Sequence, residues 1–313
     1  MKKKLVAGAV TLLSVVTLAA CANGTNKDVV TMKGDTITVS DFYDEIKTNQ
    51  GAQQVLFQMT INKVFEKEYG SKVSDKEVDK ELAKQKKQLG NQFDAYLAQQ
   101  GLTEETAKKQ IRSNMLLEYA VNQAAKKDIK ESDYKAAFES YTPEVTAQII
   151  KLDSEDKAKE VLEAAKAEGA DFAQIAKDNS TDTATKDKGG EVKFDSGTTD
   201  IPSQVKEAAF KLDENGISDV ITVSAGQNYS ASYYIVKLNK KTEKGSDWKK
   251  YEKRLKEIIV DGRKQDTNYI RSIIAKAMTN ANIKVKDDAF KSTFNQYLQN
   301  IGVQTSDSSS SSK

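Results

Sequence analysis

Apolar residues recur at helical spacing through residues 40–140 and again beyond residue 241, which predicts helices in both end regions of the chain. Their apolar stripes are narrow and their polar faces are wide. Ser74 and Glu77 form a capping box, and Thr103 precedes two acidic residues in a first helical turn. Because few large apolar residues serve many helices, we expect several of them to be thinly packed.

Two short β features accompany these helices. Residues 29–32 and 36–39 surround a Lys-Gly-Asp turn and predict a hairpin, with Ser40 as the cap of the helix that follows. The Ile-Lys-Val run at residues 283–285 predicts an edge strand. The rest of both end regions is expected to be helical.

The pattern changes at Pro143. From there to residue 241, short β-rich runs and short amphipathic helices alternate in the order β-α-α-β-α-β-β. The predicted strands are residues 145–152, 191–194, 217–223 and 232–238. The predicted helices begin at Ser154, at Asp171 and after Pro202. We therefore expect an α+β chain, mainly helical, in which one small domain is inserted between two helical regions.

The N-terminus has the three parts of a secretory signal. Lysines at positions 2–4 precede an uncharged run over residues 5–20, which ends in Leu-Ala-Ala directly before Cys21. A membrane span needs about 20 apolar residues, so a buried or retained anchor helix is the weaker interpretation. The tetrapeptide resembles a bacterial lipobox, which implies a signal peptide over residues 1–20, a lipid on Cys21 and a tether over residues 21–28.

Composition narrows the available chemistry. The 313 residues include one cysteine and no histidine, which excludes histidine-dependent triads, intramolecular disulfides and multi-cysteine metal clusters. The net charge of +2 becomes −1 without residues 1–20, so nothing indicates a nucleic-acid partner. Neither a phosphate-binding glycine loop nor a calcium loop occurs, and we expect no cofactor and no metal. The serine-rich residues 304–313 are expected to be disordered.

Several phrases in the middle segment resemble the parvulin type of peptidyl-prolyl isomerase. They are Gly-Ala-Asp-Phe-Ala-Gln-Ile-Ala-Lys-Asp-Asn-Ser over residues 169–180, Gly-Gly-Glu over 189–191, Ala-Ala-Phe-Lys-Leu over 208–212 and Gly-Ile-Ser-Asp over 216–219. With the lipobox and the helical flanks, the whole chain is similar to PrsA-type foldase lipoproteins of Gram-positive bacteria. The flanks also resemble the chaperone SurA. The resemblance implies that residues 29–142 and 242–303 fold together as a chaperone module, with the isomerase domain, residues 143–241, inserted between them.

The resemblance also implies site residues. The parvulin pattern has two facing histidines, a nearby Cys or Asp, and an apolar cup for the proline ring. The two histidine positions fall on Ile149 and Tyr234, and the acidic position falls on Asp182. The cup falls on Val192, Ile201, Val205 and Phe210. From the residues alone, Asp182 in its Ser-Thr-Asp loop is equally well a turn residue, and the cup residues are equally well core.

The function implied is that of a lipid-anchored foldase on the extracellular face of the cell membrane, which assists secreted proteins to fold after translocation. Because both histidine positions are replaced, we expect weak or no isomerase activity. A fully active isomerase that relies on Asp182 is one alternative, and a solute-binding or adhesin lipoprotein is another. The expected partners are unfolded or partly folded secreted proteins and the cytoplasmic membrane, through lipid on Cys21. The apolar helices leave homodimerisation open.

Overall fold

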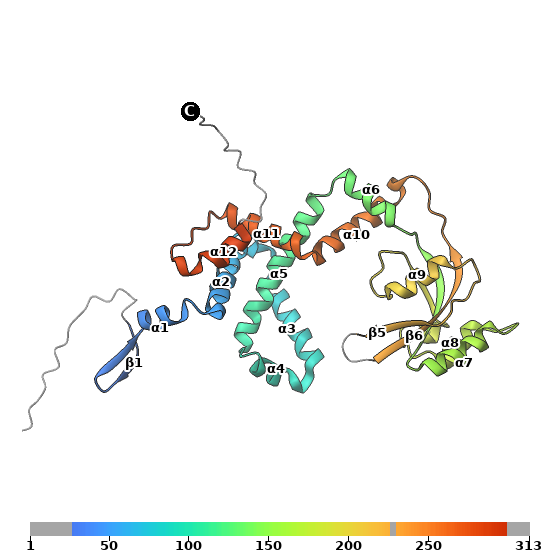
Figure 1. Cartoon of the computed structure of the whole chain (residues 1–313), viewed down its shortest axis with the longest axis horizontal. Helices are drawn as coiled ribbons and strands as arrows, with labels where there is room; N and C mark the ends of the chain where they lie inside the picture. The colour runs from blue at the N-terminus through green and yellow to red at the C-terminus, as the bar shows by residue number, and fades with distance from the viewer. Residues whose placement is uncertain (1–26, 226–229, 299–313) are drawn as a thin grey trace, which may run out of the picture. The chain divides into compact units, whose positions relative to one another are not determined.

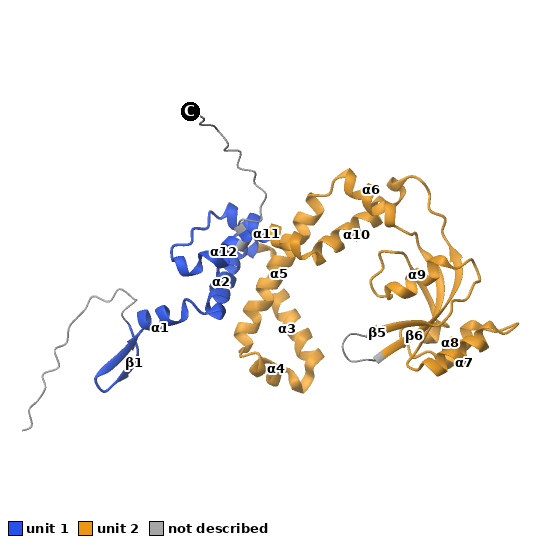
Figure 2. Ribbon diagram, in the orientation of Figure 1, with its two compact units in different colours: residues 1–70, 274–313 blue, residues 71–273 orange. Residues whose placement is uncertain are grey.

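The structure is a computed structural model that describes residues 27–225 and 230–298. The chain divides into two compact units, residues 1–70 with 274–313 and residues 71–273 (Figure 2). The predicted signal peptide, Cys21 and the serine-rich tail lie outside the described residues. The first unit therefore combines segments from the two end regions of the chain.

The first unit begins with the predicted hairpin, which is confirmed (Figure 1). Strand β1 (Asp28–Met32) pairs antiparallel with β2 (Asp35–Thr38), and every residue of β1 is exposed. The turn between them places Gly34 at a φ of 89°, a conformation that favours glycine. Since an isolated hairpin is marginally stable in water, it contributes little core to this unit.

Helix α1 (Val39–Ile46) follows the hairpin and is capped by Thr38, so the predicted cap at Ser40 is wrong. The Thr38 hydroxyl accepts a hydrogen bond from the Asp41 amide, and the Asp41 carboxylate accepts one from the Thr38 amide. This reciprocal capping box satisfies two amides that would otherwise be unpaired, which explains why the helix begins two residues earlier than predicted.

Helix α2 (Gln50–Tyr69) forms the core of the first unit. Its buried Phe57 stacks on Tyr297 of α12 (Lys291–Leu298), with ring centroids 4.2 Å apart. The same ring meets the edge of Phe294 at 5.5 Å. These aromatic contacts join a helix near the start of the described chain to one near its end.

Helix α11 (Thr267–Asn280) precedes the segment for which an edge strand was predicted, and that prediction is wrong. Asn282 adopts a φ of 51°, and the Ile283 amide donates back to the Met278 carbonyl at 3.2 Å. The backbone at residues 283–285 therefore leaves a helix terminus instead of pairing with a strand.

The second unit contains helices before and after its sheet. They are α3 (Asp75–Leu89), α4 (Phe93–Gln99), α5 (Glu104–Lys127), α6 (Glu131–Ser140) and α10 (Glu252–Gln265). The predicted caps Ser74 and Thr103 are confirmed. Helix α10 packs against α5 and α6, where Arg263 donates to the Ala125 carbonyl at 3.0 Å and to the Asp133 carboxylate at 2.7 Å.

Short 3-10 helices also occur among the described residues. They lie at Gly70–Lys72, Gly90–Gln92, Lys186–Lys188, Trp248–Tyr251 and Asp288–Phe290. Over residues 27–225 and 230–298, none of the helices combines the length and apolar content needed to cross a membrane.

The sheet of the second unit has the strand order β4-β3-β6-β5, and every neighbouring pair is antiparallel. Its elements are β3 (Val145–Leu152), α7 (Glu155–Lys166), α8 (Phe172–Asn179), β4 (Glu191–Phe194), α9 (Ser203–Lys211), β5 (Ile221–Ala225) and β6 (Ser230–Lys241). The predicted order β-α-α-β-α-β-β and the α+β class are thus confirmed.

One predicted strand begins later than expected. Residues 217–223 were predicted to be extended, but β5 starts at Ile221, and Ile217 forms only an isolated bridge with Lys237. The Ser218 hydroxyl accepts the Val236 amide at 3.0 Å. Because a side chain takes the place of a strand carbonyl there, the ladder is interrupted before β5.

Helices cover both faces of the sheet (Figure 1). Successive residues of a strand point to opposite faces, and β3 is buried on both. Ile150 and Leu152 pack with α7 and α8, whereas Val145, Ala147 and Ile149 pack with α9. The α9-facing side carries most of the predicted site residues.

Candidate functional site

The α9-facing side of the sheet contains both positions at which the parvulin pattern has histidine. Ile149 on β3 is 3% exposed and pairs with Val236 of β6. Tyr234 lies two residues from Val236, so it shares this face and packs, half-buried, against the same apolar cluster. An isoleucine side chain offers no hydrogen bond, whereas a tyrosine hydroxyl can donate and accept.

The predicted cup residues pack around that cluster as well. Val205 of α9 is fully buried, and the Phe210 ring lies 5.8 Å from the ring of Phe194. Val192, Ile201 and Phe210 are only partly buried. The cluster is therefore core on its inner side and reaches solvent on its outer side.

Three further residues border the cluster and were not predicted as site residues. They are Leu212, Ile221 and Val223, all partly buried. The alternation of Ile221, Thr222 and Val223 places the two aliphatic side chains on one face of β5, and this signal could have identified them.

Asp182 occupies a turn whose hydrogen bonds are local. Its carboxylate accepts from the Ala184 amide at 3.1 Å and from the Thr185 hydroxyl at 2.5 Å. The loop is attached to β3, because the Thr181 amide donates to the Lys151 carbonyl at 2.8 Å. Lys151 in turn pairs with Tyr234, so β3 lies between the loop backbone and Tyr234. The geometry favours the turn interpretation of Asp182.

Close packing of the backbone explains why glycine occupies the Gly-Gly motif before β4. Gly190 has a φ of 79°, and its carbonyl accepts the Ile149 amide at 2.8 Å. A Cβ atom at Gly190 would lie 2.5 Å from the Ile149 carbonyl oxygen. Glycine here allows the loop to extend the sheet edge beside Ile149.

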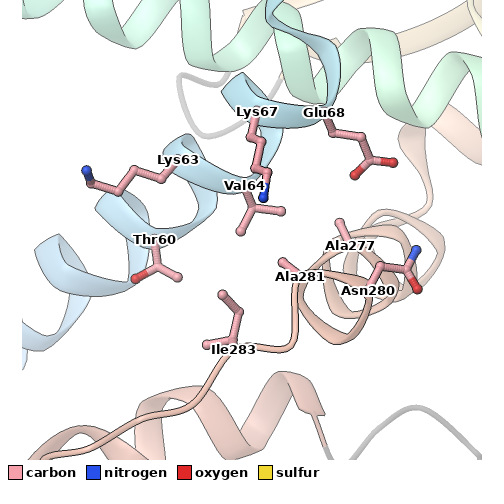
Figure 3. A pocket seen from close by; sticks show the side chains of 9 residues that line it. All are labelled: Thr60, Lys63, Val64, Lys67, Glu68, Ala277, Asn280, Ala281 and Ile283. Atoms are coloured by element: carbon pink, nitrogen blue, oxygen red, sulfur yellow. The ribbon is translucent and has the colours of Figure 1, made fainter.

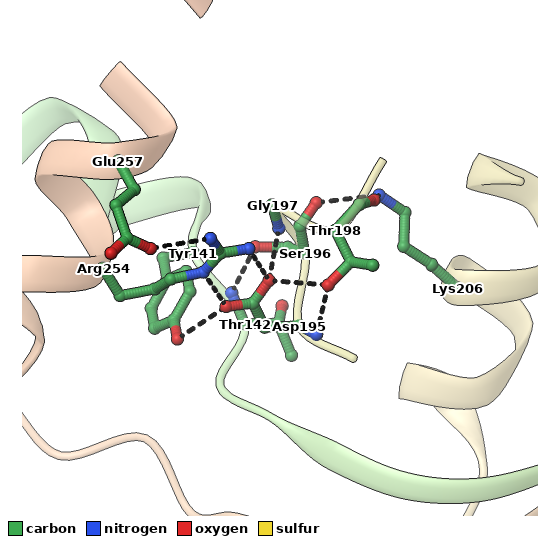
Figure 4. Close-up of polar contacts among 9 residues, drawn as sticks. All are labelled: Tyr141, Thr142, Asp195, Ser196, Gly197, Thr198, Lys206, Arg254 and Glu257. Atoms are coloured by element: carbon green, nitrogen blue, oxygen red, sulfur yellow. Dashed lines mark hydrogen bonds and ion pairs between the residues drawn. The ribbon is translucent and has the colours of Figure 1, made fainter. Parts of the chain in front are cut away.

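A buried charged cluster, which we call the Asp195 clasp, lies where β4 ends (Figure 4). The Asp195 carboxylate accepts from Nε and Nη2 of Arg254 at 2.6 and 2.8 Å. It also accepts from the Gly197 amide at 3.0 Å, the Thr198 hydroxyl at 3.1 Å and the Tyr141 hydroxyl at 3.2 Å. These five residues define the clasp, and sequence analysis did not predict it.

The clasp is a fixed ion pair at neutral pH. Burial raises the pKa of Asp195, but the hydrogen bonds and charge of Arg254 outweigh burial and hold that pKa below its ordinary value. Burial and the adjacent carboxylate raise the pKa of Tyr141. Asp195 is therefore ionised and Tyr141 protonated near pH 7, an arrangement suited to holding structure and not to transferring protons.

The first unit contains a groove of about 490 Å³ between α2 and the segment that ends α11 (Figure 3). Val64, Ala277, Ala281 and Ile283 give it apolar walls. Lys67 reaches into the space between the two segments (Figure 3). The groove therefore combines an aliphatic surface with a flexible cation.

Exposed apolar side chains are also concentrated in the first unit. Among the described residues, the large apolar side chains that are exposed are Val29, Val30, Met32, Ile37, Phe42, Tyr43, Val55, Met59 and Tyr96, and all but Tyr96 lie in this unit. Apolar surface that is concentrated in this way is typical of interaction sites. In the part of the chain that the structure describes, no group of three or more acidic, Cys or His side chains could hold a metal.

Comparison with known proteins identifies the middle segment. Residues 141–240 match the family model described as "Rotamase: PPIC-type PPIASE domain". The foldase protein PrsA of Streptococcus sanguinis strain SK36 is 62% identical over 96% of this chain and 90% of its own length. The foldase protein PrsA of Streptococcus gordonii is 60% identical over the full length of both chains.

Solved structures give the same relationship. A crystal structure of foldase protein PrsA from Streptococcus pneumoniae superposes with a TM-score of 0.79 at 55% identity, over 87% of this chain and 99% of the other. The corresponding protein from Lactococcus lactis gives a TM-score of 0.65 at 39% identity, over 87% and 99%. The sequence match over the full chain and the shared architecture show that the chain belongs to the PrsA family of parvulin-type foldases.

Proposed function

We propose that the chain is a membrane-anchored foldase that acts outside the cytoplasm, where it holds secreted proteins while they fold and isomerises prolyl bonds weakly or not at all. The observation that carries this proposal is the occupancy of the two family histidine positions. Ile149 and Tyr234 stand there, while the apolar cluster around them is kept. Such a face retains the means to bind a proline ring and lacks most of the polar groups of the family pattern.

The chemistry supports low turnover. Rotation about a peptide bond has a barrier of about 18–20 kcal/mol, and an isomerase must favour the twisted amide over the planar one. Ile149 supplies no donor, and the Asp182 carboxylate is engaged by Ala184 and Thr185. Two means of catalysis remain. One is exclusion of water from the bound prolyl bond, and the other is a hydrogen bond from the Tyr234 hydroxyl.

The first unit supports the holding role. Its exposed apolar side chains and the groove beside α2 offer surface to polypeptides that have not yet buried their own apolar residues. We infer that unfolded or partly folded secreted proteins are the partners. Self-association through the same surface stays a prediction, which sedimentation of the purified protein tests.

The N-terminal sequence supports the proposed location. Cys21 directly follows the uncharged run, and several acyl chains on it would give stable attachment where one chain is marginal. Replacing Cys21 with alanine is expected to release the protein from the membrane fraction of its host. Retention of the Cys21→Ala variant on membranes contradicts the lipid anchor.

An isomerase assay tests the central claim. The mature protein, from residue 21 onward, is given a tetrapeptide with an Ala-Pro bond, and its rate is compared with that of a histidine-containing parvulin. We expect little acceleration over the uncatalysed reaction. Full turnover that is lost in Asp182→Asn, which preserves an acceptor for the Ala184 amide, would instead establish the active-isomerase alternative.

A second assay separates the two activities. The mature protein and a variant that lacks residues 143–241 are compared for suppressing aggregation of an unfolded secreted protein. We expect the deletion variant to retain most of the suppression, since the exposed apolar residues of the first unit remain. Complete loss, in a variant that circular dichroism shows to be folded, would assign holding to the isomerase domain. Membership of the foldase family leaves no support for the solute-binding or adhesin alternatives.

A further inference from the structure

The loop between β4 and α9 supplies part of the proposed peptide-binding face. It starts at Asp195, includes Ile201 of the cup, and continues into α9, where Val205 is buried in the cluster beneath that face. Residues 195–202 form no helix or strand. Two backbone hydrogen bonds, from the Ser196 amide to the Thr142 carbonyl and from the Thr198 amide to the Asp195 carbonyl, and several side-chain hydrogen bonds fix their conformation.

Two cations hold this loop. Lys206 Nζ donates to the carbonyls of Ser196, at 2.9 Å, and of Thr198. Arg254 binds the Asp195 carboxylate through two parallel hydrogen bonds, and Asp195 itself accepts the Gly197 amide. The loop carbonyls thus point toward Lys206 of α9, and the Asp195 carboxylate points toward Arg254 of α10 (Figure 4).

Arg254 differs from Lys206 in its position along the chain. It lies outside the matched isomerase domain, residues 141–240, and belongs to the helix that packs against α5 and α6. Asp195 is only 6% exposed. A buried carboxylate that loses its guanidinium partner is strongly disfavoured, so removal of Arg254 should destabilise this conformation of the loop.

Helix α10 also touches the loop directly. A Cβ atom added to Gly197 would lie 2.4 Å from Cγ1 of Ile258. Glycine at this position therefore lets the loop backbone approach α10 closely enough for Arg254 to reach Asp195. Helix α10 and the loop therefore share an interface that has an apolar contact at Ile258 and an ion pair at Arg254.

We propose that Arg254 is a positioning residue for the peptide-binding face, holding the loop that carries Ile201 from a helix outside the isomerase domain. The inference rests on the peptide-binding face proposed above. It makes α10 a support of the binding face, because Arg254 of α10 holds one wall of that face through Asp195. Binding of a prolyl peptide and the attachment of α10 to the loop are therefore coupled.

The test uses the full mature chain and the Arg254→Ala variant. Affinity for a tetrapeptide with an Ala-Pro bond is measured by titration, and exchange of the Gly197 and Thr198 amide hydrogens is measured in parallel. We expect about tenfold weaker peptide binding, within the usual range of coupling between sites, together with faster exchange at both amides. Arg254→Lys keeps the charge but not the two parallel hydrogen bonds, and should recover part of the affinity.

Arg263→Ala is the matched control, because Arg263 lies on the same helix and pairs with Asp133 instead of the loop. It should lower stability and leave peptide affinity unchanged. Wild-type peptide affinity in Arg254→Ala, or an equal loss of affinity in Arg263→Ala, overturns the positioning role. Neither result contradicts the proposed peptide-binding face. Absence of peptide binding by the wild-type chain overturns the face itself and this inference with it.

Discussion

The isomerase-type domain and the first unit use apolar residues differently. In the domain, adjacent strand residues are buried on both faces of the sheet, with Ile149 at 3% and Ile150 at 0% exposure. In the first unit, α1 has no buried residue, and Val55 of α2 is 59% exposed. The domain uses its apolar side chains for its own core, whereas the first unit leaves many of them in contact with water.

This difference suggests a division of work within one chain. A closely packed domain can shape a small cup, because interiors with few voids hold side chains in fixed positions. A unit with exposed apolar surface can contact many sequences without selecting one geometry. The comparison predicts that substitutions in the domain cost stability, and that substitutions on the exposed surface of the first unit cost holding activity instead.

The largest effect is expected for Gly190→Ala in the domain. The new Cβ would lie 2.5 Å from the Ile149 carbonyl oxygen, at a φ of 79° that disfavours alanine. We expect the free energy of unfolding of the domain to fall by about 3 kcal/mol, from backbone strain together with the lost packing beside β3. Thermal unfolding followed by circular dichroism measures the loss, and amide exchange at Ile149 locates it.

Gly169→Ala provides the control. Gly169 has a similar φ of 76°, but a Cβ there would meet no atom within 4 Å. The backbone conformation alone should cost about 1 kcal/mol. Equal losses in the two variants would show that close packing at Gly190 contributes nothing, and would weaken the contrast between the domain and the first unit.

Local signals in the sequence predicted most of the elements, and this has a physical reason. Caps such as Ser74 and Thr103 act within three residues, and the β-α-α-β-α-β-β order follows from short-range periodicity. The run at residues 283–285 has strand-like residues but follows a helix terminus at Asn282. Propensity over three residues says nothing about whether a neighbouring strand exists.

Candidate site residues were named only where the family resemblance reached them. Val192, Ile201 and Val205 were placed by motif, and the structure brings them to one cluster. Asp195 and Arg254 lie 59 residues apart, and no local pattern distinguishes either from the many other charged residues of this chain. Long-range pairs of this kind depend on the packed fold, so a single sequence cannot indicate them.

The next largest effect is expected in how the stability of the domain depends on pH. Arg254 holds the pKa of Asp195 below its ordinary value in the folded state, whereas the pKa of an aspartate in an unfolded chain is about 3.9. A depressed folded pKa gives stability that is present above the unfolded pKa and is lost as pH falls through the folded one. Unfolding measured between pH 7 and pH 3 should therefore show wild type losing its advantage over Asp195→Asn below about pH 4.

The size of that advantage is modest. Charge-assisted hydrogen bonds contribute about 1.5–3 kcal/mol each at most, and burial of the carboxylate offsets part of this. Asp41→Asn in the first unit is the control for a lowered pKa at an exposed position, and its stability is measured over the same pH range. The pKa of Asp41 is also lowered, by hydrogen bonds from Thr38. A wild-type advantage over Asp195→Asn that stays constant down to pH 3 would contradict the ionised clasp.

The smallest effect on stability, and the most informative for function, is expected on α2. Val55 and Met59 are 59% and 51% exposed and lie one helical turn apart. Replacing both with serine should change the free energy of unfolding by no more than about 0.5 kcal/mol per site, because no buried contact is lost. Suppression of aggregation should nevertheless fall, since these side chains are available to an unfolded chain.

Tyr96→Ser is the matched variant, because Tyr96 is also large and 45% exposed but belongs to the second unit. If exposed apolar area alone determined holding, Tyr96→Ser would reduce aggregation suppression about as much per residue as the α2 changes. If the concentration of such residues in the first unit matters, only the α2 variant should lose activity, at unchanged stability. Full suppression of aggregation by the Val55→Ser, Met59→Ser double variant would show that the exposed side of α2 is not the holding surface. The Val64 side of the groove would then be the next place to substitute.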